Sequence, residues 1–249
     1  MSRSYHLGIS CYFHDSAISL VDETGKILFC AQEERFSRSK HDSRIPNLAL
    51  SQLKREIPDV SQKLSSVSFY ENPHKKRNRQ LFNLARNFVA KPQLKNDLWN
   101  KVIDPKQQLN RLKKSVNQTL HAKVKKIDYF DHHLTHAASA FFPSGMSNAL
   151  IFVFDGVGEW ATTSVYLGKG KSFTKCWSRR FPNSIGLMYS AFTQLCGFKV
   201  NTGEYKLMGM APYGEPTFKK IIMEKIVHVY DNPPFFRLNM HYFEFLSEK

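Results

Sequence analysis

Two histidines and one aspartate have the side-chain types and the spacing that a metal site needs. His132 and His136 are four residues apart in a segment with a helical pattern, so both imidazoles project from one helix face about one turn apart. Asp155 ends an apolar strand, Leu150–Phe154, and a carboxylate at such a strand end faces the cleft of an α/β sheet. Two histidines and a carboxylate leave positions open for substrate and suit Fe(II) or Zn(II). Histidines that cap a helix or fill a core remain the alternative, and His133 points to another face, where a structural role is expected.

The residues that follow Asp155 could approach a phosphate group. Gly156 and Gly158 would let backbone N–H groups come close to phosphate oxygens, and Glu159 completes an acidic, glycine-containing loop. The segment lacks the Gly-Lys-Ser/Thr of a Walker A loop, and a hairpin turn explains it equally well.

His14 occupies the corresponding loop near the start of the chain. An imidazole there could act as a general base or contact a phosphate, because its charge changes near neutral pH. A histidine in a turn with no chemical role is the alternative.

The elements that position these residues form two similar series. Strands are expected at Tyr5–Ser10, Ser16–Val21, Ile27–Gln32, Val67–Tyr70 and Lys126–Phe130, and again at Ala149–Phe154, Thr162–Leu167, Phe173–Arg179 and Phe236–Phe245. Helices are expected at Asn47–Ile57, 78–90, 106–120, His132–Phe142, Ile185–Cys196 and 217–230, with Glu204–Met210 as a further segment.

In both series a strand, a polar loop, a strand, a Gly-Lys turn and a strand follow one another, although few residues are identical. This order is typical of the duplicated ribonuclease-H-type fold of actin, Hsp70 and the sugar kinases, an α/β class. We expect a complete first lobe at 1–146 and a second lobe at 147–249 that is incomplete.

Composition sets the broad class. The 249 residues are 42% hydrophobic and 23% charged, as in ordinary globular proteins. No apolar run approaches the length of a membrane span, and the N-terminus lacks a signal-peptide core. The four cysteines are scattered in apolar or strand-like contexts, which favours buried free thiols and a cytoplasmic location.

Most of the formal net charge of +15 comes from one segment. Between His74 and Lys126 fifteen Lys and Arg face two Asp, so this stretch carries +13. Its aromatic residues fall at helical spacing rather than as a stacking platform for single strands. We interpret it as a solvated basic helical hairpin, inserted at about 74–124, and do not expect a nucleic-acid partner. The alternative is that these cations bind an RNA, an acidic partner or an anionic substrate.

Five blocks together resemble the carbamoyltransferases of the nodulation and antibiotic-tailoring type. They cover nearly the whole chain in order: Phe13-His14-Asp15-Ser16-Ala17; Glu33 to His41; Asp131-His132-His133 with His136 to Phe141; Asp155-Gly156 with Gly158-Glu159-Trp160; and Gly203-Glu204-Tyr205-Lys206 with Met208-Gly209 and Ala211 to Gly214. The chain is also similar, more distantly, to the threonylcarbamoyl-transferring tRNA-modification proteins, which share the His-x-x-x-His pair.

The resemblance implies an O-carbamoyltransferase that uses ATP. A C-terminal domain of the family makes carbamoyl-adenylate from carbamoyl phosphate and ATP, and the actin-like N-terminal domain passes the carbamoyl group to a hydroxyl of a small molecule. By resemblance, His132, His136 and Asp155 are the metal ligands and His14 is the general base.

The resemblance also implies binding residues beyond the metal site. Gly156, Gly158, Glu159, Gly203, Glu204, Lys206 and Gly209 would lie along the adenylate site. Arg35, Arg38 and Lys40 could bind carbamoyl phosphate or a substrate anion, although a basic turn explains them as well; a surface ion pair is the alternative for Glu204 and Lys206.

The family's domain continues beyond residue 249 and supplies a further carboxylate ligand, so we expect a C-terminal half or partner chain to complete catalysis. A homodimer is a further possibility for the partner. A catalytically inactive nucleotide- or partner-binding remnant and an RNA-modification subunit are the competing functions.

Overall fold

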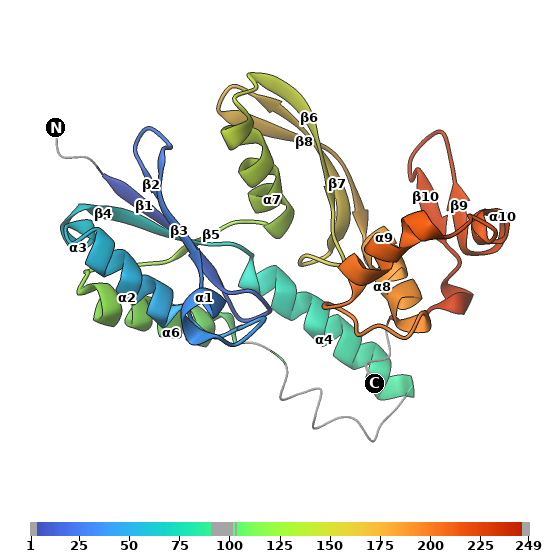
Figure 1. Ribbon diagram of the computed structural model, residues 1–249, viewed down its shortest axis with the longest axis horizontal. Coiled ribbons are helices and arrows are strands. Elements are labelled where there is room, and N and C mark those ends of the chain that lie inside the picture. Colours follow the sequence, from blue (N-terminus) through green and yellow to red (C-terminus); the bar gives the residue numbers. More distant parts are fainter. Residues whose placement is uncertain (1–3, 91–101, 103, 246–249) are drawn as a thin grey trace. The chain divides into compact units, whose positions relative to one another are not determined.

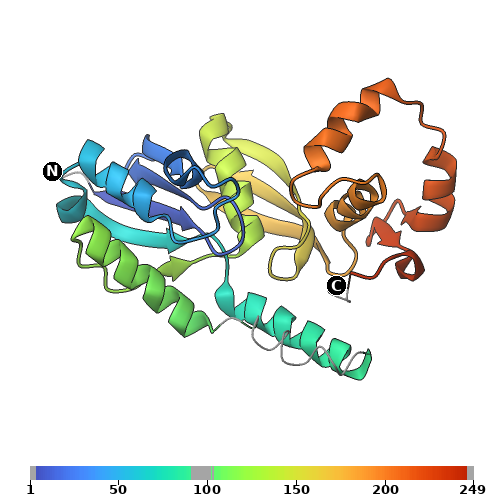
Figure 2. The ribbon, with the colours of Figure 1, turned by 60° about the horizontal axis from the view of Figure 1, so that its bottom comes forward.

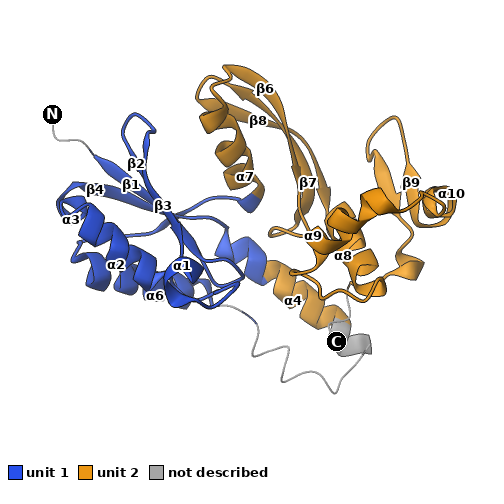
Figure 3. Cartoon of the chain, viewed as in Figure 1, with its two compact units in different colours: residues 1–77, 102–132 blue, residues 78–101, 133–249 orange. Residues whose placement is uncertain are grey.

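The computed structural model describes residues 4–90, 102 and 104–245, apart from the side chains of 87–90. The chain divides into two compact units (Figure 3). The first comprises residues 1–77 and 102–132, and the second comprises 78–101 and 133–249.

The first unit is built on a five-stranded mixed sheet of order β3-β2-β1-β4-β5 (Figure 1). Its strands are β1 (Tyr5–Ser10), β2 (Ala17–Asp22), β3 (Ile27–Gln32), β4 (Leu64–Phe69) and β5 (Asp128–Tyr129). β1, β2 and β3 form an antiparallel meander, whereas β4 pairs parallel to β1 and β5 pairs parallel to β4. Alternate residues of β1 are buried, as a sheet covered on one face requires.

Two long helices bury the apolar face of this sheet. α2 (Asn47–Glu56) and α6 (Pro105–Leu120) lie side by side (Figure 2), and the short helices α1 (Glu34–Ser37) and α3 (Val60–Lys63) flank α2 in sequence. Leu50 and Leu53 of α2 and Leu112 and Val116 of α6 are completely buried in one core with the strands. Asp104 caps α6 by accepting a hydrogen bond from the backbone N–H of Lys106, directly before a proline at the first helical position.

The second unit contains a three-stranded antiparallel sheet of order β6-β7-β8. Its strands are β6 (Asn148–Phe154), β7 (Ala161–Lys169) and β8 (Ser172–Arg180). α7 (His132–Phe141) covers one face of the sheet, where Ala137 and Phe141 pack on Ile151 and Val153. A 3-10 turn, η2 (Phe142–Ser144), links α7 to β6.

The residues after β8 form short helices and a two-stranded sheet. They comprise α8 (Ile185–Leu195), α9 (Glu204–Met210), η3 (Ala211–Tyr213), α10 (Lys219–Ile221), a π-helical turn η4 (Ile222–Ile226), β9 (Val227–Val229), β10 (Phe236–Leu238) and η5 (Met240–Tyr242). β9 and β10 pair antiparallel, and their buried residues Val227, Phe236 and Leu238 pack against Trp177 and Ile185.

The predicted mixed α/β class is confirmed, and both series begin with an antiparallel three-stranded meander, β1–β3 and β6–β8. The predicted lobes 1–146 and 147–249 stay a prediction. The compact units differ from them: α7, apart from His132, and the part of α4 (Pro73–Ala90) from residue 78 onward group with the later part of the chain.

Two predicted elements near the C-terminal end are shorter than predicted. The predicted helix 217–230 is present as the helical turns α10 and η4, but it ends at Ile226, because β-branched residues such as Val227 and Val229 favour the strand β9. The predicted strand Phe236–Phe245 ends at Leu238, where the side chain of Asn239 accepts a hydrogen bond from His241 N–H and starts a 3-10 turn.

The basic segment is not a solvated hairpin insertion throughout. α4 (Pro73–Ala90) carries many of its cations, but α6 is a core helix of the first unit with Leu112, Val116 and Leu120 fully buried. The charges of α6 occupy its outer face, so its amphipathic pattern, rather than its charge, determines where it packs. The predicted helix 78–90 is confirmed with an earlier start; the linking residues 91–101 lie outside the described residues.

The four cysteines are free thiols, as predicted, but the prediction that they are buried is wrong for three. Cys11 is buried, whereas Cys30, Cys176 and Cys196 are exposed. Cys30 and Cys176 lie on strands and Cys196 directly follows α8, so a strand-like or apolar context does not by itself predict burial of a cysteine.

No helix among the described residues is long and apolar enough to cross a membrane.

Candidate metal centre and neighbouring sites

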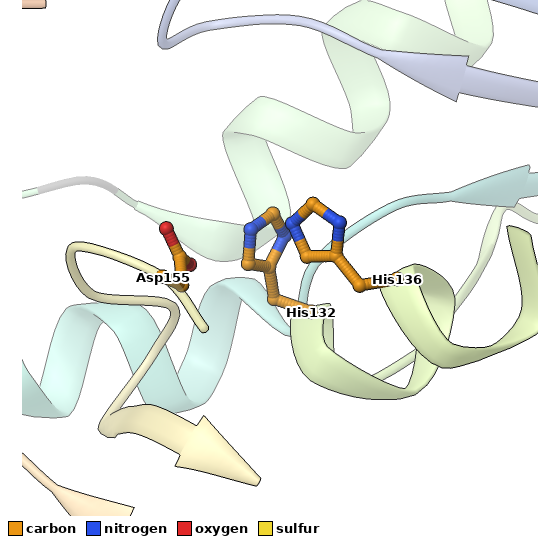
Figure 4. Close-up of side chains that lie close together, drawn as sticks. All are labelled: His132, His136 and Asp155. Atoms are coloured by element: carbon orange, nitrogen blue, oxygen red, sulfur yellow. The ribbon is translucent and has the colours of Figure 1, made fainter. Parts of the chain in front are cut away.

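α7 and the end of β6 bring together His132, His136 and Asp155. His132 and His136 lie on one face of α7, and Asp155 follows the last residue of β6 (Figure 4). One ligand atom from each of the three residues lies within 4.8 Å of the others. Donors around an ion at about 2.1 Å are at most about 4 Å apart, so the observed spacing is close to that of a metal site. The donor set, two imidazoles and one carboxylate, fits Fe(II) or Zn(II).

His133 lies next to the Asp155 carboxylate on its buried side. Its side chain is buried, its Nδ1 lies 2.8 Å from the hydroxyl of Ser164 on β7, and its Nε2 lies 3.7 Å from Oδ2 of Asp155. Ser164 in turn lies 3.2 Å from the hydroxyl of Ser178 on β8. His133 is thus buried against the sheet, on another face of α7 than His132 and His136, as expected; that it orients the Asp155 carboxylate stays a hypothesis.

The turn after Asp155 is closed by its own backbone. Asp155 N–H donates to the carbonyl of Thr162 at 2.9 Å, and Gly158 N–H donates to the carbonyl of Ala161 at 2.9 Å. Gly156 N–H donates to the Asp155 carboxylate at 2.6 Å. Both glycine N–H groups are thus engaged inside a turn that joins two strands, as the hairpin alternative requires. A role in nucleotide binding for Gly156, Gly158 and the buried Glu159 stays a prediction that depends on the resemblance.

α8 supports this turn from outside the sheet. Ser184 caps the helix by accepting a hydrogen bond from Leu187 N–H at 3.0 Å, and its hydroxyl donates towards the carbonyls of Gly156 (2.6 Å) and Asp155 (3.1 Å). A Cβ added to Gly186 would lie 2.5 Å from the carbonyl oxygen of Asp155. The backbone that carries the candidate ligand therefore rests directly on the first turn of α8, a support that no local sequence pattern reveals.

The predicted adenylate-binding residues lie on α9: Gly203 precedes its first residue, and Glu204, Lys206 and Gly209 are within it. Glu204 accepts hydrogen bonds from Ser190 on α8 and from Asn201 N–H, at 2.8 and 2.9 Å. Partial burial alone would raise the pKa of Glu204, but the hydrogen bonds from Asn201, Ser190 and Gly203 outweigh it and lower the pKa below its usual value. Glu204 thus stays ionised and fastens the start of α9 to α8, rather than forming a surface ion pair.

The other predicted residues of this block differ in what surrounds them. A Cβ on Gly203 would meet Phe198 and Lys199 below 3 Å, so close packing requires this glycine, whereas nothing lies within 4 Å of the corresponding position at Gly209. Lys206 is exposed, with its ammonium 6.0 Å from the ring centre of Tyr205.

His14 lies in the first unit, in the loop between β1 and β2. Its Nδ1 is 2.8 Å from Oδ2 of Asp15, and the other oxygen of Asp15 is 3.0 Å from Nδ1 of His41. Glu34 accepts a hydrogen bond from His41 N–H at 3.0 Å. Asp15, Glu34 and His41 also offer ligand atoms within 4.8 Å of one another. The first two of the five sequence blocks therefore meet at one corner of this unit.

Arg35, Arg38 and Lys40 are exposed around the same corner, on and after α1. Asp42 lies just beyond them, buried and hydrogen-bonded by the Arg44 guanidinium at 2.6 Å, which holds the pKa of this carboxyl far below its usual range. The backbone of Ser16 bonds to Asp42, so the His14 loop and the basic segment are held as one piece.

A buried ion pair underlies the His14 loop. Glu71 and Lys76, both nearly inaccessible, lie 2.7 Å apart, and the Lys76 ammonium lies 5.6 Å from the ring centre of Phe13. Burial, aided by the charge of Glu71, raises the pKa of the Cys11 thiol far above its usual value. Sequence reasoning missed this pair, because Lys76 is one cation in a run of many.

The sequence of the chain corresponds to a known family. Residues 5–249 match the family model described as Carbamoyltransferase N-terminus, and the chain belongs to this family.

Its relatives are longer proteins. The chain is 41% identical over 253 residues to the uncharacterized protein sll1178 of Synechocystis sp., covering 97% of this chain and 40% of the relative. It is 27% identical to the nodulation protein NolNO of Sinorhizobium fredii, covering 89% of this chain and 31% of the relative. Against the nodulation protein NolO of Bradyrhizobium diazoefficiens, 38% identity extends over 86 residues, which is 34% of this chain and 16% of the relative. The chain thus spans two fifths or less of these proteins.

A solved structure of the Aquifex aeolicus PPX-GPPA enzyme matches with a TM-score of 0.39 and 12% identity, over 88% of this chain and 64% of that one.

Proposed function

We propose that this chain is the metal-binding part of an O-carbamoyltransferase that moves a carbamoyl group from carbamoyl-adenylate to a hydroxyl of a small molecule. The observation that carries the proposal is the grouping of His132, His136 and Asp155 in a chain that belongs to the carbamoyltransferase N-terminal family. The two similar meanders, β1–β3 and β6–β8, support the duplicated actin-like fold that such a protein would use.

His132, His136 and Asp155 would hold Fe(II) or Zn(II), which as a Lewis acid polarises the carbamoyl carbonyl or the adenylate phosphate. The chain's own contribution is to fix these ligands. α7 sets the spacing of the two imidazoles, while His133 and the turn on Ser184 and Gly186 set the direction of the carboxylate.

His14 is the proposed general base. Its Nδ1 is hydrogen-bonded to Asp15, so Nε2 is the nitrogen left to accept a proton. In the transfer step the acceptor oxygen bonds to the carbamoyl carbon, the bond from that carbon to the adenylate oxygen breaks, AMP leaves, and the acceptor's proton passes to His14.

Carbamoyl phosphate and ATP are the proposed sources of the donor. Arg35, Arg38 and Lys40 offer exposed cations at the same corner as His14, which suits an anionic substrate. The proposed adenylate contacts are Gly203, Glu204, Lys206 and Gly209. The Glu204 carboxylate already accepts hydrogen bonds from Ser190 and Asn201, so its proposed contribution is to order the start of α9.

Metal binding tests the proposal first. The purified chain, stripped with a chelator and titrated with Fe(II) under anaerobic conditions or with Zn(II), is expected to bind one ion, and His132→Ala and His136→Ala are expected to weaken binding at least tenfold. His228→Ala, an exposed histidine on β9, is the matched control and should bind as the wild type does. Equal binding by wild type and His132→Ala would refute the metal site.

Transfer itself needs a longer protein, because the matched relatives extend far beyond this chain. A chimaera in which this chain replaces the matched segment of the Synechocystis relative would be given radiolabelled carbamoyl phosphate, ATP and a panel of sugar and aminocyclitol alcohols. We expect label in an acceptor and release of AMP, both reduced by His14→Ala. AMP release without any labelled acceptor, unchanged in His14→Ala, would contradict the assigned base. An intact metal site without any ATP-dependent chemistry would instead favour the inactive remnant.

A further inference from the structure

One carboxylate joins two histidines at the corner of the first unit that carries His14. Oδ2 of Asp15 lies 2.8 Å from Nδ1 of His14, and Oδ1 of the same carboxylate lies 3.0 Å from Nδ1 of His41. An ionised carboxylate accepts hydrogen bonds and donates none, so each imidazole must carry a proton on Nδ1. When both rings are neutral, Nε2 is therefore the nitrogen with a free lone pair in each of them.

The two histidines differ in what surrounds Nε2. In His41 this nitrogen is buried and has no hydrogen-bond partner among the described residues, although the side chain as a whole is 31% exposed. A proton on this nitrogen would be buried without an acceptor, which is unfavourable. The side chain of His14 is 48% exposed, so an acceptor hydroxyl can approach it. We therefore expect His41 to be the member of the pair that keeps its tautomer.

The backbone around this contact repeatedly adopts the left-handed conformation. Asp15 and His41 have φ values of 49° and 56°, and Tyr12 and Arg38 have values of 75° and 57°. Residues other than glycine adopt this conformation uncommonly, and such positions tend to cluster at functional sites. The N–H of His41 donates to Oε2 of Glu34 at 3.0 Å, which helps to hold the turn that presents its ring.

Backbone hydrogen bonds brace the same two segments against each other. Ser16 N–H donates to the carbonyl of Asp42 at 2.8 Å, and Tyr12 N–H donates to the carbonyl of Ser43 at 2.7 Å. Both bonds join the loop between β1 and β2 to residues that directly follow the second histidine. The two oxygens of the Asp15 carboxylate are already engaged, which favours a hydrogen-bonded brace over a bound ion at this corner.

We propose that Asp15 and His41 are positioning residues for His14: Asp15 fixes the imidazole in the tautomer whose Nε2 is unprotonated, and His41 fixes Asp15. The inference rests on the proposed function, in which His14 is the base, but the tautomer can be measured without metal, ATP or acceptor. When Nε2 takes the acceptor's proton, the ring becomes a cation beside the Asp15 carboxylate, which stabilises it. His41 acts on the base through this carboxylate alone.

Asp15→Asn tests the contact, because an amide offers one accepting oxygen and one donating nitrogen. It can accept from one imidazole and must donate to Nδ1 of the other. Since Nε2 of His41 is buried, we expect His41 to keep its proton on Nδ1 and His14 to move its proton to Nε2. NMR of the isotope-labelled 249-residue chain distinguishes these tautomers at about pH 8, where an ordinary histidine is mostly neutral. Asp231→Asn, an exposed position of the second unit, is the control and should change neither ring.

Substitutions of His41 separate its hydrogen bond from its bulk. His41→Asn keeps a donor close to the place of Nδ1 and tolerates the left-handed backbone, so His14 should keep its wild-type tautomer. His41→Leu has a similar size but no donor, and should give a mixture of His14 tautomers. His241→Gln, exposed in the second unit, is the control. Circular dichroism would verify that each variant folds.

The chimaera described above adds a kinetic readout. Asp15→Asn should lower kcat/KM for the acceptor at least tenfold, because the proton on Nε2 of His14 blocks the base. His41→Leu should lower it at least threefold, whereas His41→Asn should stay within twofold of the wild-type sequence.

The tautomer decides the inference. A wild-type His14 that carries its proton on Nε2, or a tautomer that is unchanged in Asp15→Asn, would overturn it. Undiminished transfer in Asp15→Asn despite a changed tautomer would overturn the positioning role. A chimaera without any transfer would count against the proposed function alone, because the tautomers are measured in the isolated chain.

Discussion

Replacing Gly186 by alanine should weaken metal binding although Gly186 is not itself a proposed ligand. Gly186 is the second residue of α8 and lies against the backbone of the turn that carries Asp155. The added Cβ would lie 2.5 Å from the Asp155 carbonyl oxygen and 2.7 Å from both the Asp155 carbonyl carbon and the Gly156 nitrogen. All three are backbone atoms, so no side-chain rotation can relieve the contact.

The size of the displacement follows from these distances. Ordinary van der Waals contact begins at 3.4 Å, so the turn or the helix must give by 3.4 − 2.5, or about 0.9 Å. Metal–ligand distances tolerate about 0.2 Å. A shift of this size should therefore weaken metal binding at least tenfold, about 1.4 kcal/mol, while overpacking costs about 1–3 kcal/mol of stability.

The assay is competition with a chromophoric chelator for Zn(II), paired with urea unfolding of the metal-free chain. Gly209→Ala is the control, because nothing lies within 4 Å of a Cβ there and the residue is inside α9. Gly209→Ala should bind metal normally and gain up to about 1 kcal/mol in the free energy of unfolding. Metal affinity in Gly186→Ala equal to that of the wild type, in a folded chain, would refute the claim that α8 positions Asp155.

Three further predictions concern the first unit and the thiols. In the folded chain Cys30, Cys176 and Cys196 should react quickly with iodoacetamide, whereas Cys11, buried and with a raised pKa, should react only on unfolding; rapid labelling of Cys11 by mass spectrometry would contradict its burial. Asp42→Asn should lower the free energy of unfolding at pH 7. Because the folded pKa of Asp42 is depressed, its ionised carboxylate stabilises the fold above the unfolded pKa of about 3.9, and this contribution is lost as the pH falls towards the folded pKa. The difference in the free energy of unfolding between Asp42→Asn and the wild type should therefore shrink in acid. Urea titrations at several pH values would measure it. Leu112→Ala should destabilise the chain by about 2–5 kcal/mol in the same titrations, whereas Lys114→Ala should change it by less than about 0.5; equal small effects would return α6 to the status of a solvated insertion.

The sequence alone predicts the helices and strands whose pattern depends only on neighbouring residues. β1, β3 and α7 were predicted within a residue or two, because alternation in strands and the three-to-four repeat in helices depend on neighbours alone. The grouping of His132 with His136 follows from helical spacing, and that of Asp155 with them follows from its place at a strand end.

The parts that failed depend on contacts far apart in sequence. α6 was assigned to an insertion because its charges were counted and its buried leucines were not, although Leu112 and Val116 lie on one face against α2. The role of Gly156 and Gly158 in nucleotide binding stays a prediction; that their N–H groups bond within the turn depends on the pairing of β6 with β7, which the glycines alone do not reveal. The support from Gly186 depends on a contact across about thirty residues, which no local pattern reveals.

The dependence of the Asp155 turn on α8 has a consequence for how the chain matures. During synthesis His132 and His136 leave the ribosome first and Asp155 next, but Ser184 and Gly186 emerge about thirty residues later. The carboxylate therefore acquires its final direction only after the first turn of α8 has docked. If the proposed metal centre exists, an ion that reached the nascent chain earlier would meet two histidines and a carboxylate without this support, so we predict that the site is complete only after α8 has formed.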